Sequence, residues 1–294
     1  MSTAIRQHLV SARARVPLLA SFVCVDAALR AALAGTRDTI FGQRFLIYYG
    51  RGGQDTIRNY DLAVLDSEIE VEIPPYRSRG GILLGYLSLG EVHGSRSYSS
   101  ELSLEGLLLE ASPNWPDARL VDMRAARWRD RVVTQLVPEV LARGFDGLFF
   151  DTLDNAEALE QREPIRFAGM VEGAAELVRA VRRCFPKVPI MINRGYAVLP
   201  RIAGQFDMLL GESVRTTFDA GSNTYRMVPE DGYTWQVEKM RSAHARNRRL
   251  RLFSLDYWNP EDRDGIAGIY ALQRANGFVP YVATFDLTRI VPEP

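Results

Sequence analysis

The stretch Gly144-Phe-Asp-Gly-Leu-Phe-Phe-Asp151-Thr-Leu-Asp154 decides the fold that we expect for this 294-residue chain. Gly144 follows an amphipathic segment, residues 127–143, at the position where a helix usually ends on a glycine. The run from Leu148 to Phe150 is too short for a helix and apolar on both faces, which is typical of a strand buried between two layers. Asp151 then lies at the carboxyl end of a parallel strand, the edge where α/β barrels carry their chemistry.

The same pattern, a short apolar run followed by a turn and an amphipathic segment, repeats along most of the chain. The runs that we predict to be strands are residues 45–50, 62–66, 82–88, 147–151, 189–195, 206–212, 250–257 and 277–284. They alternate with helical segments over roughly 240 residues, which is the size of a (β/α)8 barrel. We therefore predict an α/β fold, a (β/α)8 TIM barrel that forms a single domain over residues 44–294.

Two features of the chain bear on this prediction. Residues 92–122 are the longest segment that does not follow this pattern. We expect them to form an elaborated loop after the third strand that lies over the site. A doubly wound open sheet could show the same alternation, but it predicts a glycine-rich phosphate loop after an early strand. Gly50-Arg-Gly-Gly53 lacks the spacing of such a loop and is expected to be a turn.

Composition excludes several classes of function. Lys plus Arg equals Asp plus Glu at 36 each, so no global field attracts nucleic acid. Cys24 and Cys184 are too few for a disulfide framework. Only three histidines occur, His8, His93 and His244, which argues against a multi-histidine zinc site. We expect no metal and no cofactor, with a carboxylate-only magnesium site as the open alternative.

The amino-terminal 43 residues precede the first predicted strand and are expected to be a leader or a helix. Their apolar run, residues 16–25, resembles the core of a signal peptide and follows arginines at positions 6, 13 and 15. Asp26 and Arg30 interrupt the run, so a secretion signal and a helix in front of the barrel both stay open. The run is too short to cross a bilayer, and we expect no membrane span.

Acidic and aromatic side chains gather where the predicted strands end. They are Tyr48, Tyr49, Asp66, Tyr86, Glu91, Asp151, Asp154, Asn193, Arg194, Glu212, Asp256 and Tyr257, and Asp122 closes the long loop. Glycoside hydrolysis needs one carboxylic acid that protonates the leaving oxygen and one carboxylate that attacks the sugar or activates water. Crowding two carboxyl groups separates their pKa values, so that one stays protonated near neutral pH. Asp151 and Glu212 are the expected pair, and rings such as Trp115 can pack on sugar faces.

Several of these residues could instead have a purely structural role. Asp154 and Asp122 each precede a predicted helix and could cap it. Asp66 ends a strand at a turn, where aspartate is common. Asn193 and Arg194 could position the acids rather than touch a substrate. Glu212 follows an apolar run, where an unpaired charge is costly, and that favours a functional role.

Several short motifs follow one another in order along residues 44–285. They are Tyr48-Tyr-Gly50, Tyr60-Asp-Leu-Ala-Val-Leu-Asp66, Leu84-Gly-Tyr-Leu-Ser-Leu-Gly90-Glu-Val92, Val121-Asp-Met-Arg124, Trp128-Arg129, residues 144–154, Ile192-Asn-Arg-Gly195 and Glu212-Ser-Val214. In this order and spacing they resemble the endo-α-1,4-polygalactosaminidase family of glycoside hydrolases. The tail, around residues 255–257 and 277–280, is similar to the related hydrolase domain of Pel-polysaccharide processing proteins.

The resemblance implies a TIM barrel that cleaves α-1,4-linked galactosamine or N-acetylgalactosamine polysaccharides internally. It also implies acid/base machinery on the strand-four aspartate, Asp151 or Asp154, and on Glu212. By analogy with barrel α-galactosidases, we expect retention, with the aspartate as nucleophile and Glu212 as acid/base. Asp151 is favoured over Asp154 because a strand end is held more rigidly than the turn beyond it.

The resemblance further implies an exported protein, periplasmic or secreted, and we expect a monomer. Two other readings stay open. One is a barrel that binds carbohydrate without cleaving it, and the other is a hydrolase of a different α-linked glycan.

Overall fold

The computed structural model describes residues 44–68 and 80–294. The expectations for residues 1–43 therefore lie outside the described residues. Eight parallel strands form one sheet in the order β1-β2-β3-β7-β8-β9-β12-β13. Their bounds are β1 (Phe45–Tyr48), β2 (Leu62–Asp66), β3 (Ile82–Ser88), β7 (Gly147–Asp151), β8 (Ile190–Asn193), β9 (Met208–Glu212), β12 (Arg251–Tyr257) and β13 (Val279–Ala283).

The sheet curls into a nearly closed barrel. β13 lies beside β1, and the backbone N–H of Tyr49, just past β1, donates to the carbonyl of Leu287 at 2.8 Å. The strands are buried along almost their whole length, since both of their faces are covered. The predicted TIM barrel is confirmed, and each predicted strand lies within about three residues of an observed one.

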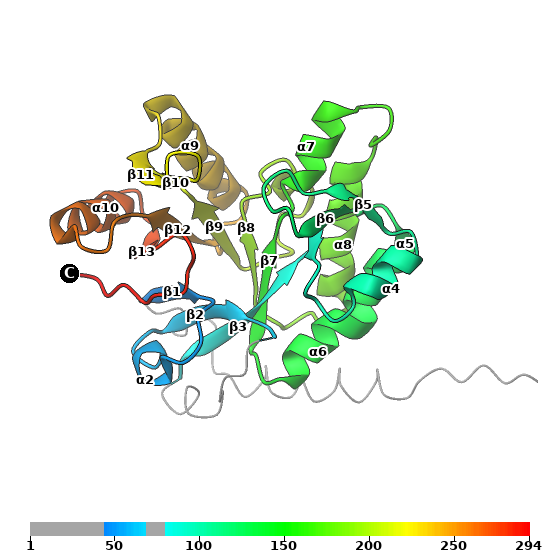
Figure 1. Ribbon diagram of the computed structural model, residues 1–294, viewed down its shortest axis with the longest axis horizontal. Coiled ribbons are helices and arrows are strands. Elements are labelled where there is room, and N and C mark those ends of the chain that lie inside the picture. The colour runs from blue at the N-terminus through cyan, green and yellow to red at the C-terminus, as the bar shows by residue number, and fades with distance from the viewer. Residues whose placement is uncertain (1–43, 69–79) are drawn as a thin grey trace, which may run out of the picture.

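Helices alternate with the strands and surround the barrel (Figure 1). They are α2 (Gln54–Ile57), α5 (Ala126–Arg131), α6 (Val137–Ala142), α7 (Asn155–Arg162), α8 (Met170–Cys184), α9 (Glu230–Arg246) and α10 (Arg263–Ala275), with a short 3₁₀ turn η2 (Leu199–Arg201). α8 buries an apolar stripe that includes Met170, Ala174 and Val178. Gly144 follows α6 with φ 103°, so the glycine that was expected to end this helix does so.

The helix predicted over residues 127–143 is continuous but changes its winding in the middle. α5 passes into a π-helical segment η1 (Val132–Leu136) and then into α6. Pro138 has no N–H with which to bond the carbonyl of Thr134, so the regular series of α-helical backbone hydrogen bonds is interrupted there. Trp128 on α5 is fully buried, and its Nε1 donates to the carbonyl of Leu89, which fixes this helix to the end of β3.

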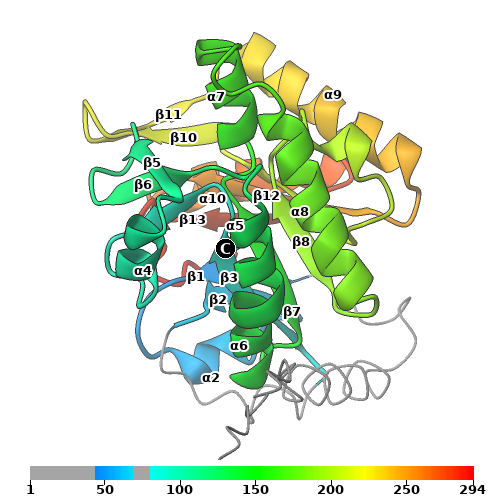
Figure 2. The ribbon, with the colours of Figure 1, turned by 90° about the vertical axis from the view of Figure 1, so that its right-hand side faces the viewer.

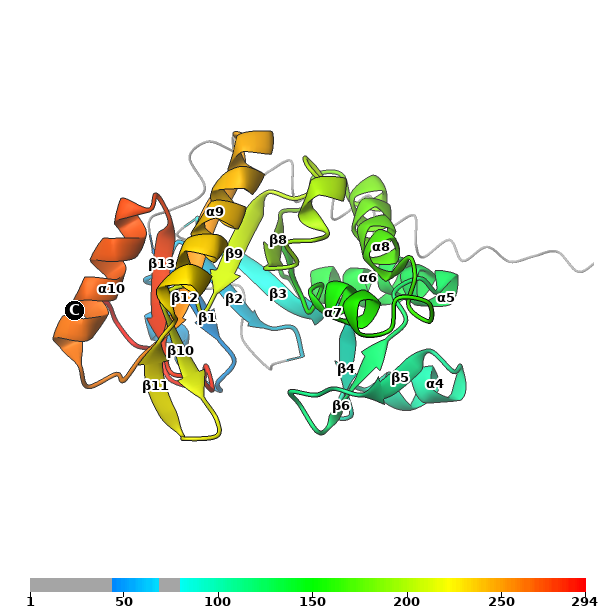
Figure 3. The same ribbon diagram turned by 90° about the horizontal axis from the view of Figure 1, so that it is seen from above.

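Two additions to the barrel lie at the carboxyl ends of its strands. The region predicted as an elaborated loop holds a small antiparallel sheet, β4 (Glu91–His93), β5 (Leu108–Ala111) and β6 (Ala118–Val121), with helix α4 (Ser99–Leu104). A hairpin of β10 (Thr216–Asp219) and β11 (Thr224–Met227) follows β9. Figures 2 and 3 show the insertion and the hairpin projecting from the same side of the barrel.

Candidate active site

Three neighbouring strands bring Asp151, Asn193 and Glu212 together. These residues are the last residues of β7, β8 and β9. The Nδ2 atom of Asn193 donates both to Asp151 Oδ1 at 2.9 Å and to Glu212 Oε2 at 2.6 Å. Since both oxygens bond to one nitrogen, they are at most 5.5 Å apart, the sum of the two distances. Carboxyl groups about 5–5.5 Å apart suit retaining glycosidases, and inverting enzymes hold theirs about 6.5–9.5 Å apart.

Asp151 is the more heavily bonded of the two acids. Its Oδ2 accepts from the Tyr86 hydroxyl at 3.0 Å, and its Oδ1 accepts from the Thr152 backbone N–H at 2.8 Å. Burial, followed by the charges of Glu212 and Asp154, raises the pKa of Asp151 to about 7, against the lowering effect of the Asn193 and Thr152 bonds. The Glu212 charge beside Asp151 therefore disfavours ionisation of Asp151.

Tyrosine hydroxyls complete the bonding of both acids. The Tyr257 hydroxyl donates to Glu212 Oε1 at 2.7 Å. Burial and the charge of Glu212 raise the pKa of Tyr257 well above its usual value, and burial and the charge of Asp151 do the same for Tyr86. Both phenols therefore stay protonated and act as hydrogen-bond donors at any pH where the protein works.

The backbone leaves these three strands in a strained conformation. Thr152, Arg194 and Ser213 directly follow the three site residues, and their φ angles are 65°, 51° and 52°. Left-handed backbone costs a residue other than glycine about 1–3 kcal/mol, and a β-branched threonine is an outlier there. Gly90 approaches this turn so closely that a Cβ on it would lie 2.2 Å from the Thr152 carbonyl oxygen. Strain at three adjacent strand ends is typical of a functional site.

A cleft of about 530 Å³ opens beside the acid pair. Tyr86, which holds Asp151, lines this cleft together with Tyr49, Asp66 and Glu91. Its volume lies within the range of about 300–1,000 Å³ found for pockets that hold drug-sized ligands. Asp151 and Glu212 are each partly exposed as whole residues, and the Tyr86 hydroxyl connects Asp151 to this cleft.

An aromatic stack joins the insertion to the hairpin. Trp115 lies parallel to Phe285 at 6.1 Å between ring centroids, and Phe285 lies parallel to Phe218 of β10 at 4.7 Å. Tyr257 meets Phe285 edge-on, which connects the stack to Glu212. Trp115 is 50% exposed and lines the cleft, so it is placed to pack against a sugar ring, as its sequence context suggested.

Asp154 and Arg194 form a looser pair near the acids. Arg194 Nη2 lies 3.8 Å from Asp154 Oδ2, and both side chains are about two-fifths exposed. Asp154 occupies the N-cap position of α7, but its side chain makes no capping hydrogen bond. The charge of Asp154 contributes to the raised pKa of Asp151, after burial and the charge of Glu212. The negative charge of Asp154 therefore influences the ionisation of Asp151.

Asp256, expected to contact substrate, lies beneath the surface instead. Its side chain is 0% exposed, and its carboxylate accepts from the backbone N–H groups of Arg215 and Thr216 and from Gln273 Nε2 at 2.6–2.8 Å. Burial raises the pKa of Asp256 to about 6, so it is ionised at neutral pH. We assign it to positioning the chain between Glu212 and the β10–β11 hairpin.

The Asp256→Ala variant is expected to lose about 3–5 kcal/mol of unfolding free energy. Removing one partner of a buried charged network leaves the others unsatisfied, here two backbone N–H groups and the Gln273 amide. Urea denaturation followed by circular dichroism measures the loss. The Asp286→Ala variant, which removes an exposed turn carboxylate, is the control and should lose less than about 1 kcal/mol. Equal losses would contradict the assignment.

The remaining predicted contacts divide between the cleft and its surroundings. Tyr49 faces the cleft, whereas Tyr48 is buried and donates to the carbonyl of Arg51, since neighbouring strand residues point to opposite faces. Asp66 lines the cleft but is bound by both guanidinium nitrogens of Arg96, at 2.9 and 3.2 Å. The Arg96 guanidinium also lies 5.7 Å from the centroid of the Tyr86 ring.

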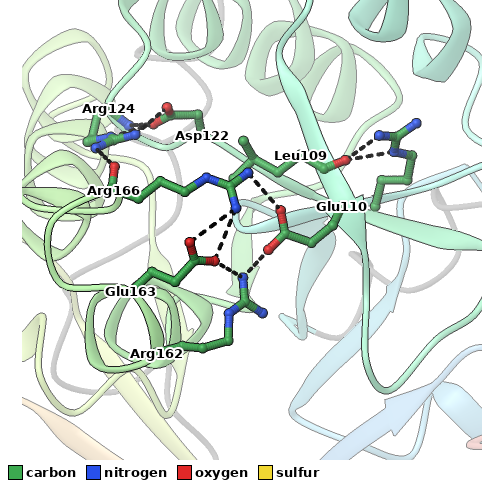
Figure 4. A network of polar contacts seen from close by, with 8 residues as sticks. Leu109, Glu110, Asp122, Arg124, Arg162, Glu163 and Arg166 are labelled. Atoms are coloured by element: carbon green, nitrogen blue, oxygen red, sulfur yellow. Dashed lines mark hydrogen bonds and ion pairs between the residues drawn. The ribbon is translucent and has the colours of Figure 1, made fainter.

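Asp122 belongs to a network that anchors the insertion (Figure 4). Its two oxygens accept from the Arg124 guanidinium at 2.8–2.9 Å, and this guanidinium donates in turn to the carbonyls of Arg166 and Ala168. Nearby, Glu110 of β5 pairs with Arg162 of α7 and with Arg166. Asp122 lies at the base of the insertion within this network, and no bond joins it to the acid pair.

Some residues of the site were not foreseen from the sequence. Arg96 lies inside the long insertion, and nothing in the sequence ties it to Asp66. Thr152 was visible only as the residue after Asp151. Phe218 and Phe285 each follow a predicted strand, and their aromatic character was the one available signal. Among the described residues, no group of three His, Cys, Asp or Glu side chains is placed to hold a metal ion.

Comparison with known proteins assigns this chain to a family. The sequence profile of glycoside-hydrolase family GH114 matches residues 27–293. The glycoside hydrolase domain of PelA from Pseudomonas aeruginosa is 25% identical, with a TM-score of 0.76 over 85% of this chain and 98% of that one. Aspergillus fumigatus Ega3, solved in complex with galactosamine, shares the fold at 12% identity, with a TM-score of 0.64 over 88% of this chain and 99% of that one. An uncharacterized protein of Deinococcus radiodurans is 25% identical over 228 residues, 73% of this chain and 68% of that protein.

Proposed function

Because this chain belongs to glycoside-hydrolase family GH114, we propose that it is a retaining, endo-acting hydrolase of α-1,4-linked galactosamine or N-acetylgalactosamine polysaccharides. The single observation that carries the mechanism is the amide of Asn193, which holds one oxygen of Asp151 and one of Glu212 within 5.5 Å of each other, the sum of its two bonds. This spacing lies in the range of retaining glycosidases, in which a carboxylate attacks directly, and below the roughly 6.5–9.5 Å that inverting enzymes need to accommodate the attacking water.

In the first step, the Asp151 carboxylate attacks the anomeric carbon of the bound sugar. Glu212 gives its proton to the glycosidic oxygen, so the bond to the leaving chain breaks as that chain gains a hydroxyl group. The product of this step is a sugar joined covalently to Asp151. In the second step, water attacks the same carbon, Glu212 takes the proton from that water, and Asp151 is released as a carboxylate.

Hydrogen bonding supports this division of roles. Asp151 accepts three hydrogen bonds, from Tyr86, Asn193 and the Thr152 N–H. Glu212 accepts from Tyr257 and Asn193, one donor on each oxygen. Donors stabilise an ionised carboxylate, so the three bonds that Asp151 accepts favour the carboxylate form that attacks as the nucleophile.

The sequence motifs and the charges of the cleft support the substrate class. The motifs shared with polygalactosaminidases include Gly90-Glu91 and residues 144–154, which lie around the acid pair. Asp66, Glu68 and Glu91 line the cleft opposite Arg51 and Arg96, so carboxylates outnumber guanidinium groups there, and such a cleft attracts a polymer of protonated amino sugars.

A release assay with defined polymers tests the proposal. The wild-type protein is expected to generate new reducing ends, as internal fragments rather than single sugars, from α-1,4-linked galactosamine polymers and not from β-1,4-linked glucosamine polymers. Binding of the α-linked polymer without any new reducing end would replace the proposal with a non-catalytic carbohydrate-binding barrel. Cleavage of another α-linked glycan alone would retain the mechanism and reject the substrate.

The Asn193→Ala variant is expected to move the acidic limb of the kcat/KM profile to higher pH by about one unit. The Asn193 amide lowers the pKa of Asp151, so its removal raises that pKa, and the nucleophile then ionises only at higher pH. A charge-assisted hydrogen bond of about 1.5 kcal/mol corresponds to roughly one pKa unit. The Tyr196→Phe variant, which removes a hydroxyl bonded to Gln236, is the control and should leave the limb in place. If the acidic limb of the kcat/KM profile stayed in place in Asn193→Ala, the Asn193 amide would not be what lowers the pKa of Asp151.

A further inference from the structure

We propose that Phe285 is a positioning residue for the acid/base Glu212, on which it acts through the Tyr257 ring rather than by touching the substrate. The inference rests on the proposed function, because it assigns Phe285 to the proton transfers that Glu212 performs there. Phe285 lies just beyond β13 and is not among the residues that line the cleft.

The contact with Tyr257 connects Phe285 to Glu212. The two rings meet edge-on, with 5.4 Å between their centroids and 74° between their planes. Tyr257 is buried, and its hydroxyl donates to Glu212 Oε1 at 2.7 Å. A phenol O–H bond prefers the plane of its ring, and a hydrogen bond weakens when it bends, so the tilt of the Tyr257 ring decides how well its hydroxyl holds Glu212. A ring packed against Tyr257 therefore helps to fix the Glu212 carboxyl group.

Neighbouring strands place Phe285 beside Tyr257. Tyr257 is the last residue of β12 and pairs with Ala283 of β13, two residues before Phe285. The chain then turns at Leu287, whose φ is 56°, and the Leu287 carbonyl accepts from the Tyr49 N–H at 2.8 Å. The turn that carries Phe285 is thus bonded to the chain just past β1, where the barrel closes.

Two further rings hold the Phe285 ring from the additions to the barrel. Phe218 of the hairpin lies 4.7 Å away with 18° between the planes, and Trp115 of the insertion lies 6.1 Å away with 10° between them. Trp115 belongs to a tight turn, since its N–H donates to Ser112 Oγ at 3.4 Å and its carbonyl accepts from the Ala118 N–H at 2.9 Å. Near-parallel rings at such distances attract one another, so the insertion and the hairpin both hold Phe285 in place.

Loss of the Phe285 ring should slow the steps in which Glu212 moves a proton and spare the step that needs none. A misplacement of about 1 Å can cost about 10²-fold in rate, so we expect Phe285→Leu to lower kcat on an α-1,4-linked galactosamine oligomer about tenfold, with KM within about twofold. An aryl α-galactosaminide releases a nitrophenolate, which leaves without a proton. Its first step, followed as phenolate release with enzyme in excess, should stay within about twofold of wild type.

Three further variants separate this role from a general loss of packing. Phe285→Tyr keeps the ring and should restore kcat on the oligomer to within about twofold of wild type. Tyr257→Phe removes the hydroxyl through which Phe285 acts, so adding Phe285→Leu to it should cause no further loss. Trp235→Leu is the matched control, because Trp235 also meets a tyrosine, Tyr196, edge-on at 5.4 Å, but that hydroxyl bonds to Gln236 instead of an acid. It should leave both rates within about twofold of wild type.

Phe285 is partly exposed, so its variants are expected to fold, and circular dichroism checks this. Equal losses of Phe285→Leu on the oligomer and in the first step on the aryl substrate would mean that the ring serves packing alone. No loss on either substrate, or a further loss on top of Tyr257→Phe, would mean that Phe285 does not act through Tyr257. Each of these results would overturn the inference and leave the proposed function intact. A wild-type protein that cleaves neither substrate would overturn both.

Discussion

The Asp151→Asn variant is expected to lose about 10⁴-fold or more in turnover while its melting temperature stays near that of wild type. An amide cannot attack the anomeric carbon, and loss of a catalytic nucleophile removes most of the rate enhancement that the site supplies. The fold should survive because asparagine has the same shape and relieves the repulsion with Glu212 that raises the pKa of Asp151. Reducing-end release measures the loss, and circular dichroism monitors the fold.

The Asp154→Asn variant is the matched control for this prediction. It removes a neighbouring carboxylate whose contact with Arg194 spans 3.8 Å and is partly exposed, so we expect less than about tenfold loss in turnover. If Asp154→Asn lost as much as Asp151→Asn, or more, the nucleophile would be Asp154.

The Glu212→Gln variant is expected to lose about 10²–10⁴-fold in turnover on polymer, the usual contribution of a general acid. The loss in the first step should be much smaller on an aryl α-galactosaminide, because a phenolate leaves without a proton. Since Glu212 also takes the proton from water in the second step, the covalent intermediate should then accumulate. A burst of phenol equal to the enzyme concentration, followed by slow turnover, is the expected signature in a rapid-mixing experiment.

Azide distinguishes the two roles independently. In Glu212→Ala it should attack the sugar on Asp151 and give an α-glycosyl azide. In Asp151→Ala it should take the place of the missing carboxylate and give the β-glycosyl azide. If Glu212→Ala gave the β-azide and Asp151→Ala the α-azide, Glu212 would be the nucleophile and Asp151 the acid/base. If Glu212→Gln lost turnover equally on the polymer and on the aryl substrate, Glu212 would not be the proton donor.

Apolar patterning predicted most of the barrel because its strands are buried on both faces. Runs such as Leu148 to Phe150 have no polar face, and a turn or a glycine bounds each of them. The small sheet of the insertion was not predicted, since β4 pairs with β6 across more than twenty intervening residues and its strands are short. The β10–β11 hairpin does carry a local signal, two β-branched or aromatic runs around Gly221-Ser-Asn223.

The positions of Asp151 and Glu212 at strand ends followed from the sequence, whereas the direction of neighbouring side chains did not. Tyr48 and Tyr49 were both expected at the site, yet strand alternation allows only one of them to face the cleft. The buried position of Asp256 depends on how the β9–β10 connection folds over β12, which no local pattern encodes. Arg96 reaches Asp66 only because the insertion folds back over the rim of the barrel.

In a double displacement, the two acids act from opposite sides of one bond. The anomeric form of the first product tests this claim most directly, by proton NMR during the early phase of hydrolysis, before mutarotation. An α-anomer at the new reducing end is the result that the spacing across Asn193 predicts. A β-anomer would mean a single displacement by water and would contradict the assignment of Asp151 as nucleophile.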